Sequence, residues 1–166
     1  MSTLCPSCLL HFATKNDIIY HMNKENIHIA TSEDMEALGA TLIKYCQTGG
    51  KVFFLYGNLG AGKTTLVRGF LRGLGYQGKV KSPTFTLVES YELPELTIHH
   101  FDLYRIADPD ELTYIGFRDY IQENSICIFE WPEKAQKCLP SPYISCYIDI
   151  LKDGRNVTII EHATSE

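Results

Sequence analysis

The sequence contains no long apolar run and no concentration of positive charge. No apolar stretch approaches the ~18 residues that a membrane-spanning helix requires, so we expect no integral membrane segment. The amino-terminal stretch also lacks the basic region and the long apolar run of a secretory signal. Both absences predict a cytoplasmic protein.

Positive charge is scarce and scattered along the chain. Lys and Arg together number 15 against 20 Asp and Glu, which gives a formal net charge of −5. Proteins that grip nucleic acid directly carry Lys and Arg in clusters, and this chain has none. We therefore expect any link to nucleic acid to run through a partner protein.

Length and composition are those of one folded domain. The chain has 166 residues, of which 45% are hydrophobic and 21% charged, enough to bury a single core. We divide it into an amino-terminal extension, residues 1–26, and a folded domain, residues 27–166. Most of the six cysteines fall singly in or beside apolar stretches, where a free thiol packs as a small hydrophobe. These are Cys46, Cys127, Cys138 and Cys146.

Strand patterns alternate with helix patterns along the domain. The apolar runs Val52–Tyr56 and Ile126–Phe129 are typical of strands buried on both faces of a parallel sheet. Further strands are expected at residues 27–29, 85–91, 97–103, 143–151 and 156–162, the last two as a β-hairpin. Helices are expected after a capping box at residues 31–34, after Gly62, and from Asp108. This alternation predicts an α/β fold.

The segment after the first apolar strand matches the phosphate-loop pattern G-x-x-x-x-G-K-[ST]. Gly57 and Gly62 let the backbone curl so that its N–H groups converge on phosphate oxygens, and the next helix points its positive end at the same anion. Lys63 is expected to reach the β- and γ-phosphates of ATP, and the Thr64 hydroxyl to bind Mg²⁺. The alternative is a glycine-rich turn with a solvated lysine and no role in nucleotide binding. With its flanking elements, the loop predicts a three-layer P-loop NTPase fold with a mostly parallel central sheet and a carboxy-terminal hairpin.

Two acidic residues follow predicted strands. Glu130 comes directly after a buried run, where a carboxylate could complete the Mg²⁺ shell, although a surface acid at a strand end is the alternative. Asp102 ends another strand and could orient or deprotonate an attacking water, or it could instead pair with Arg105. The adjacent His99 and His100 point to opposite strand faces, and we expect them to be packing or surface residues rather than catalysts.

Thr84 lies between the phosphate-loop helix and the next strand. In many P-loop hydrolases a threonine in this interval senses the γ-phosphate and gives the loop two states. An ordinary Ser-Pro turn leading into a strand is the alternative. Thr84 is therefore a candidate switch residue.

Four motif blocks occur in a fixed order. They are Gly-Asn-Leu-Gly-Ala-Gly-Lys-Thr-Thr at 57–65, Lys-Ser-Pro-Thr-Phe-Thr-Leu-Val-Glu at 81–89, His-Phe-Asp-Leu-Tyr-Arg at 100–105 and Phe-Glu-Trp-Pro-Glu at 129–133. Across residues 27–162 this order resembles the TsaE (YjeE) family, bacterial ATPases that serve threonylcarbamoyladenosine synthesis in tRNA. The resemblance implies a weak ATPase that binds the complex of TsaD and TsaB and permits its repeated turnover, with tRNA reached only through that complex.

The resemblance also implies roles for individual residues. Glu130 would complete the Mg²⁺ site with Thr64, Thr84 would be the switch threonine, Asp102 the catalytic acid, and Trp131 a support for the site or the partner surface. The catalytic set is then Lys63, Thr84, Asp102 and Glu130. The nucleotide-binding set is Gly57, Asn58, Leu59, Gly60, Ala61, Gly62, Lys63, Thr64, Thr65, Ser32 and Gly154.

Two other function classes compete with this one. The first is a small-molecule kinase on the same fold, but such kinases carry an arginine-rich lid, and the five arginines at 68, 72, 105, 118 and 155 form no cluster. The second is a metal-stabilised nucleic-acid adaptor built on the amino-terminal extension. Cys5, Cys8 and His21 follow zinc-finger spacing, although the fourth ligand, His28, lies further along than usual. The alternative is that these residues are only an upstream extension.

Overall fold

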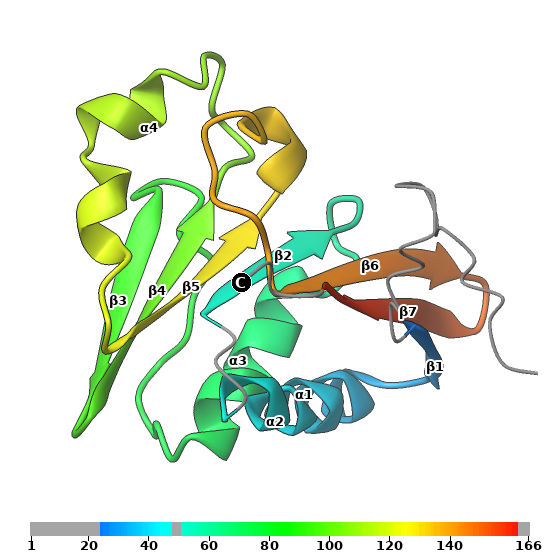
Figure 1. Ribbon diagram of the computed structural model, residues 1–166. Coiled ribbons are helices and arrows are strands. Elements are labelled where there is room, and N and C mark those ends of the chain that lie inside the picture. Colours follow the sequence, from blue (N-terminus) through cyan, green and yellow to red (C-terminus); the bar gives the residue numbers. More distant parts are fainter. Residues whose placement is uncertain (1–23, 48–50, 163–166) are drawn as a thin grey trace, which may run out of the picture.

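The computed structural model describes residues 24–47 and 51–162. Its centre is a seven-stranded sheet with the strand order β1-β7-β6-β2-β5-β4-β3 (Figure 1). The strands are β1 (Lys24–Ile29), β2 (Val52–Tyr56), β3 (Val88–Leu93), β4 (Leu96–Asp102), β5 (Ser125–Glu130), β6 (Ile144–Leu151) and β7 (Gly154–Glu161). The α-helices are α1 (Ser32–Thr41), α2 (Ile43–Cys46), α3 (Lys63–Gly73) and α4 (Glu111–Tyr114), and the 3₁₀ helices are η1 (Phe117–Tyr120) and η2 (Pro132–Lys134).

Parallel and antiparallel pairing divide the sheet evenly. β2 lies between β5 and β6 and is parallel to both, and β4 is parallel to β5. The pairs β1–β7, β6–β7 and β3–β4 are antiparallel. The predicted carboxy-terminal hairpin is therefore confirmed, whereas the prediction of a mostly parallel sheet is wrong. The β3–β4 and β6–β7 pairs are joined by two-residue turns at 94–95 and 152–153, and so short a connection can only reverse the chain.

Helices cover both faces of the central strands. α1, α2 and α3 lie on one face (Figure 1), where Phe70 of α3 packs edge-on against Phe53 of β2 with ring centroids 5.5 Å apart. On the other face, Leu112 of α4 and Phe117 of η1 are buried in a second cluster with Phe129 of β5. The strand residues of this second cluster come from β2, β4 and β5. These three strands are thus packed against apolar side chains on both faces.

α1 and α3 approach each other closely at two glycines. A Cβ atom at Gly39 would overlap the carbonyl oxygen of Leu66, and one at Gly69 would overlap the carbonyl oxygen of Glu36. Across the same contact, Arg68 donates a hydrogen bond of 3.1 Å to the Glu36 carboxylate. The position of α3, and hence of the loop before it, is therefore fixed against α1.

The helix starts follow the sequence signals only in part. The capping box is confirmed: the Asp34 N–H donates to the Thr31 hydroxyl at 3.1 Å, and the Thr31 N–H donates to the Asp34 carboxylate at 3.0 Å. The helix expected from Asp108 is a single turn that begins at Glu111, whose carboxylate accepts the Asp108 N–H at 3.0 Å. This side chain caps the turn that precedes the helix rather than a long helix.

Two strands begin at other residues than expected. The strand expected from residue 85 begins at Val88, because residues 84–86 form a turn and Leu87 takes a left-handed φ of 67°. The strand expected from residue 27 begins at Lys24. Residues 1–23 lie outside the described residues, so the division of the chain into an extension and a domain stays a prediction.

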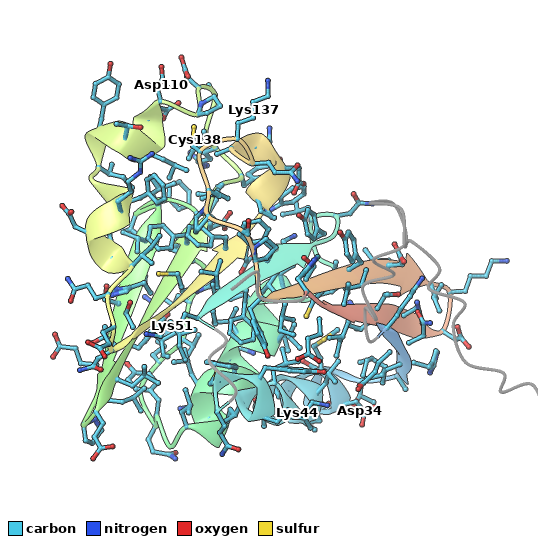
Figure 2. The ribbon with its side chains drawn as sticks, viewed as in Figure 1. Asp34, Lys44, Lys51, Asp110, Lys137 and Cys138 are labelled. Atoms are coloured by element: carbon cyan, nitrogen blue, oxygen red, sulfur yellow. The ribbon has the colours of Figure 1, made fainter. Side chains whose placement is uncertain are left out.

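Apolar side chains fill most of the interior, and the labelled charged residues Asp34, Lys44, Lys51, Asp110 and Lys137 lie at the periphery (Figure 2). Of the four cysteines expected in the core, Cys127 and Cys146 are buried, and Cys46 and Cys138 are half-buried. Lys44, Lys51 and Lys137 extend from widely separated parts of the surface (Figure 2). Within the described ranges, no helix has the length and apolarity needed to cross a membrane.

Candidate nucleotide-binding site

The phosphate loop runs from the end of β2 to the start of α3. Gly62 is the N-cap of α3 with a left-handed φ of +111°, and Gly57 has a φ of +148°. A Cβ atom at Gly57 would lie 2.7 Å from the carbonyl oxygen of Ile148 on β6, so the neighbouring strand leaves room for glycine alone. The loop therefore delivers the N-terminus of α3, with its unpaired N–H groups, to the carboxyl end of the sheet.

Lys63 is folded back over its own loop. Its Nζ donates to the carbonyl oxygens of Gly57 at 2.6 Å and Asn58 at 3.2 Å, and lies 3.9 Å from the centre of the Trp131 ring. Burial lowers the pKa of Lys63, and the charges of Glu130 and Asp102 oppose that shift. An ammonium group held among carbonyls, an aromatic face and carboxylates is positioned to bind an anion.

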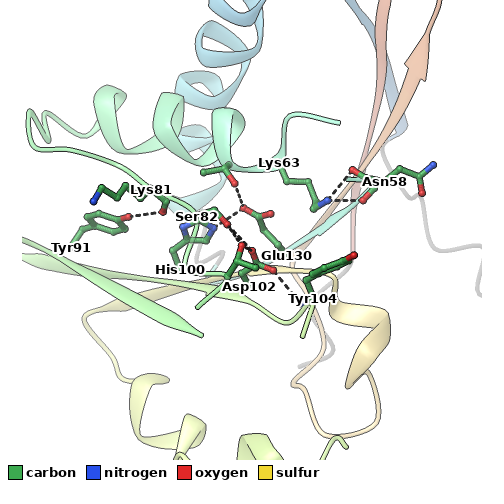
Figure 3. Close-up of polar contacts among 12 residues, drawn as sticks. Asn58, Lys63, Lys81, Ser82, Tyr91, His100, Asp102, Tyr104 and Glu130 are labelled. Carbon is green, nitrogen blue, oxygen red and sulfur yellow. Dashed lines mark hydrogen bonds and ion pairs between the residues drawn. The ribbon is translucent and has the colours of Figure 1, made fainter. Parts of the chain in front are cut away.

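Thr64, Glu130 and His100 form a hydrogen-bonded chain beneath the loop (Figure 3). The Thr64 hydroxyl donates to Glu130 Oε1 at 2.7 Å, and His100 Nε2 lies 2.8 Å from the same oxygen. Glu130 is only 3% exposed, which excludes the alternative of a solvated surface acid. Hydroxyl and carboxylate oxygens are the ligands that Mg²⁺ prefers.

Asp102 is held by a second group of donors (Figure 3). Its Oδ2 accepts hydrogen bonds from the hydroxyls of Ser82 at 2.7 Å and Thr84 at 2.6 Å, and its Oδ1 accepts the Tyr104 N–H at 3.1 Å. Among the described residues no ion pair joins Asp102 to Arg105, which instead stacks on Phe85 at 4.1 Å. The alternative interpretation, in which Asp102 pairs with Arg105, is therefore wrong. Thr84 lies in a turn, as the alternative of a Ser-Pro turn predicted, and its hydroxyl also bonds the Asp102 carboxylate.

Most of these groups line one cavity of about 370 Å³. Its lining residues are Leu59, Gly60, Gly62, Lys63, Thr64, Thr65, Ser82, Thr84, Asp102, Tyr104, Glu130 and Trp131. Of the other expected nucleotide contacts, Gly57 and Asn58 reach the site through their carbonyls on Lys63, and Ala61 is buried in the loop. Ser32 and Gly154 are not among the residues that line the cavity in the described part of the chain. Their contact with nucleotide stays a prediction.

Arg155 of β7 hydrogen-bonds the backbone of the phosphate loop, a role that the sequence did not predict. Its Nε donates to the carbonyl oxygen of Ala61 at 2.8 Å, and its terminal nitrogen donates to that of Gly60 at 3.3 Å. A trans peptide carries its C=O and N–H on opposite sides, so the Ala61 carbonyl facing Arg155 turns the Gly62 N–H away from it. The only signal in the sequence was the adjacent Gly154.

Ser82 and His100 were also missed as members of the site. Ser82 is close in sequence to the expected switch residue Thr84, and its hydroxyl joins the same carboxylate. His100 was expected to be a packing or surface residue, yet it bonds Glu130. Its position two residues before Asp102 on one strand was the available signal, because alternate residues share a face.

The donor set fits Mg²⁺ bound together with nucleotide. Within residues 24–47 and 51–162, no three His, Cys, Asp or Glu side chains gather into a metal-binding cluster. Mg²⁺ in phosphate-transfer sites is held by one or two side chains together with substrate phosphates, and Thr64 and Glu130 meet that description. Cys5, Cys8 and His21 of the zinc hypothesis lie outside the described residues, while His28 lies in β1 with its Nε2 3.9 Å from Asp153.

Comparison with known proteins identifies the family. Residues 29–158 match the family model described as threonylcarbamoyl adenosine biosynthesis protein TsaE. A Haemophilus influenzae protein named tRNA threonylcarbamoyladenosine biosynthesis protein TsaE is 56% identical over 107 residues, covering 64% of this chain and 68% of the relative. One of the same name from Treponema pallidum is 38% identical over 111 residues, covering 66% and 82%. The crystal structure of Bacillus subtilis YdiB matches with a TM-score of 0.69 at 26% identity, covering 86% of this chain and 88% of that one. The matched range contains all four motif blocks, and the chain belongs to the TsaE family of threonylcarbamoyl adenosine biosynthesis proteins.

Proposed function

We propose that this chain is a P-loop ATP hydrolase that serves formation of N6-threonylcarbamoyladenosine at position 37 of tRNA. It would bind the TsaD–TsaB complex and couple ATP hydrolysis to the turnover of that complex. One observation carries the hydrolase assignment: two buried carboxylates, Asp102 and Glu130, meet Lys63 and the hydroxyls of Thr64 and Thr84 in one cavity. The names of the relatives supply the pathway.

Phosphate binding falls to the loop and to Lys63. The N–H groups at the start of α3 and the positive end of that helix face the β- and γ-phosphates. Lys63 exchanges its hydrogen bonds to Gly57 and Asn58 for phosphate oxygens. Thr64 and Glu130 would hold Mg²⁺, which would supply charge neutralisation on the phosphates.

Hydrolysis falls to Asp102. Its carboxylate receives the proton of, or orients, the water that attacks the γ-phosphorus, while the bond to the bridging oxygen breaks and ADP leaves. Ser82 and Thr84 fix the Asp102 carboxylate through two short hydrogen bonds to Oδ2. Binding or loss of the γ-phosphate would change the hydrogen bonding of the Thr84 hydroxyl. This change would in turn alter the conformation of the turn that begins at Thr84.

Exposed apolar residues beside the cavity support coupling to a partner. Leu59 is 73% exposed and Phe85 is 85% exposed, and Leu59 also lines the cavity. Phe85 follows Thr84 directly, so a protein docked on its ring would contact the segment that bonds Asp102. The acidic net charge disfavours direct tRNA binding and is compatible with contact through a protein complex.

The test is ATP hydrolysis by the full chain, alone and with TsaD, TsaB and tRNA. We expect stimulation by the partners, and loss of turnover in Lys63→Ala. Phe85→Ala should lose stimulation while keeping basal turnover, whereas Tyr114→Ala, which removes an equally exposed ring on α4, should lose neither. Turnover that ignores these partners but depends on a small-molecule acceptor would favour a kinase instead.

A further inference from the structure

His100 is fully buried beside the proposed metal site. Its side chain is 0% exposed, and its Nε2 lies 2.8 Å from Glu130 Oε1 (Figure 3). Its other ring nitrogen, Nδ1, is a buried atom without a hydrogen-bond partner, alone in this respect among the buried side-chain nitrogens and oxygens of the described residues. A buried polar atom left unpaired costs about 1–3 kcal/mol, which an apolar side chain of similar size would avoid. Packing alone therefore does not explain a histidine here.

The hydrogen-bond chemistry fixes the direction of the His100–Glu130 bond. A carboxylate oxygen only accepts hydrogen bonds, so the proton lies on Nε2 of His100. Oε1 of Glu130 also accepts the Thr64 hydroxyl proton at 2.7 Å. Two donors on one oxygen hold the carboxylate in a single orientation. In the described part of the chain, no donor reaches the other oxygen, Oε2, and Glu130 lines the cavity.

The sheet explains why His100 can reach this carboxylate from beneath. In the parallel pairing of β4 with β5, Asp102 is opposite Glu130, and His100 is opposite Ile128. His100, Asp102 and Glu130 share the face on which α3 lies, because residues two apart point to the same side. His100 therefore lies two residues further from the carboxyl ends of the strands than the Asp102–Glu130 pair, between the Glu130 carboxylate and the core.

We propose that His100 is a positioning residue that fixes the Glu130 carboxylate, so that Oε1 holds the Thr64 hydroxyl and Oε2 is presented to the divalent cation of the nucleotide. This inference rests on the proposed function and adds a residue to its metal site. Because the Thr64 hydroxyl donates its hydrogen bond to Oε1, the lone pairs of its oxygen are available to the cation. Residues that hydrogen-bond a metal ligand orient that ligand in metal sites, and their loss lowers metal affinity by ~10–100-fold.

Amide substitutions separate positioning from packing. The amide nitrogen of glutamine can reach the place of Nε2, whereas that of asparagine reaches only the place of Nδ1. We would measure ADP affinity by calorimetry with and without Mg²⁺ for the full chain and for His100→Gln, His100→Asn and His100→Leu. We expect ADP affinity without Mg²⁺ to stay within ~2-fold in all variants. The Mg²⁺ concentration for half-maximal tightening should rise ~10-fold in His100→Asn and His100→Leu, and return close to wild type in His100→Gln.

A matched control lies next to His100. His99 points to the opposite face and bonds Ser90 at 2.8 Å, so His99→Asn should leave the Mg²⁺ dependence unchanged. In a Glu130→Gln background, His100→Asn should add no further loss, because a positioning residue acts through its partner. If His100→Leu does not fold, the Gln and Asn variants decide the question.

Two results would overturn the inference. Unchanged Mg²⁺ dependence in His100→Asn, together with a lower melting temperature, would make His100 a packing residue. An equal loss of ADP affinity with and without Mg²⁺ would place its effect on the phosphate loop instead. Absence of Mg²⁺-linked ADP binding in the unaltered chain would refute the proposed function itself, which keeps the two failures distinct.

Discussion

Asp102 and Glu130 are directly opposite each other on β4 and β5, yet their partners differ. Asp102 accepts hydrogen bonds from two hydroxyls and one backbone N–H, while Glu130 accepts from Thr64 and His100. The first set holds the Asp102 carboxylate beside the segment that contains Ser82 and Thr84. The second joins a carboxylate to the phosphate-loop hydroxyl. In the proposed function these neighbouring residues of the same charge would have different tasks, Asp102 toward the attacking water and Glu130 toward the metal.

At the residue scale, Asp102→Asn should separate chemistry from binding. The amide keeps the size of the side chain but cannot accept a proton, so we expect kcat for ATP hydrolysis to fall ~10²-fold or more. ADP affinity should change less than ~3-fold, because Asp102 bonds Ser82 and Thr84 rather than the phosphate loop. Steady-state turnover and calorimetric titration on the same preparation check this. Full turnover in Asp102→Asn would remove Asp102 from the reaction.

At the element scale, the β6–β7 hairpin should contribute to nucleotide affinity through Arg155. Its guanidinium supports the carbonyls of Gly60 and Ala61, and charge-assisted hydrogen bonds of this kind are worth about 1.5–3 kcal/mol. Arg155→Gln should therefore weaken ADP binding ~10-fold or more, measured by calorimetry. Lys152→Ala removes the same charge from an exposed position in the hairpin turn and is the control. Equal effects of the two substitutions would indicate a general charge effect instead.

Also at the element scale, the contact of α1 with α3 should not tolerate a side chain. Gly39→Ala places a methyl group against the Leu66 carbonyl oxygen, a backbone atom that can move only with its helix. We expect a loss of about 2 kcal/mol in the free energy of unfolding, measured by urea denaturation. Gly73→Ala, at the end of α3, meets first the tip of the Ile43 side chain and should cost less. A neutral Gly39→Ala would mean that the helices are further apart.

The site shows which features sequence reasoning can reach. The phosphate loop, the capping box of Thr31 and the carboxy-terminal hairpin depend on residues within a few positions of each other, so local patterns reveal them. The contact of Arg155 with Ala61 spans 94 positions, and the bond of His100 to Glu130 spans 30. Neither residue type nor spacing indicates such pairs, because strand order in the sheet brings them together. The balance of parallel and antiparallel strands was misjudged because the short β3–β4 connection was not recognised as a hairpin and the antiparallel β1–β7 pair joins strands far apart in sequence.

At the scale of the whole molecule, buried thiols predict a loss of stability at high pH. Burial raises the pKa of Cys146 from its ordinary 9.0 to about 12. Because the folded pKa is the higher one, the thiol contributes fully below pH 9, and its contribution is lost as the pH rises toward 12. Between pH 9 and 10 the loss from one such thiol is about 1 kcal/mol.

Urea titrations of the full chain and of Cys146→Ala at pH 9 and pH 10 test this expectation. The unaltered chain should lose more unfolding free energy over this interval than the variant does, by about 1 kcal/mol. The variant is less stable at pH 9 for want of packing, so the comparison is between the two differences and not between absolute values. Identical losses would show that the Cys146 thiol ionises as readily in the fold as in the unfolded chain.

The place of β7 has a consequence for how the chain is made. Among the described strands, β1 pairs with β7 alone, which separates it from β6, and the start of β7 carries the arginine that reaches the phosphate loop. A ribosome releases β1 before the other described strands and β7 after them, so β1 lacks its partner strand until all the other strands have emerged. The loop likewise lacks its rear support until then. A nascent chain halted before residue 154 should therefore hold nucleotide poorly even though its entire phosphate-loop motif has already been synthesised.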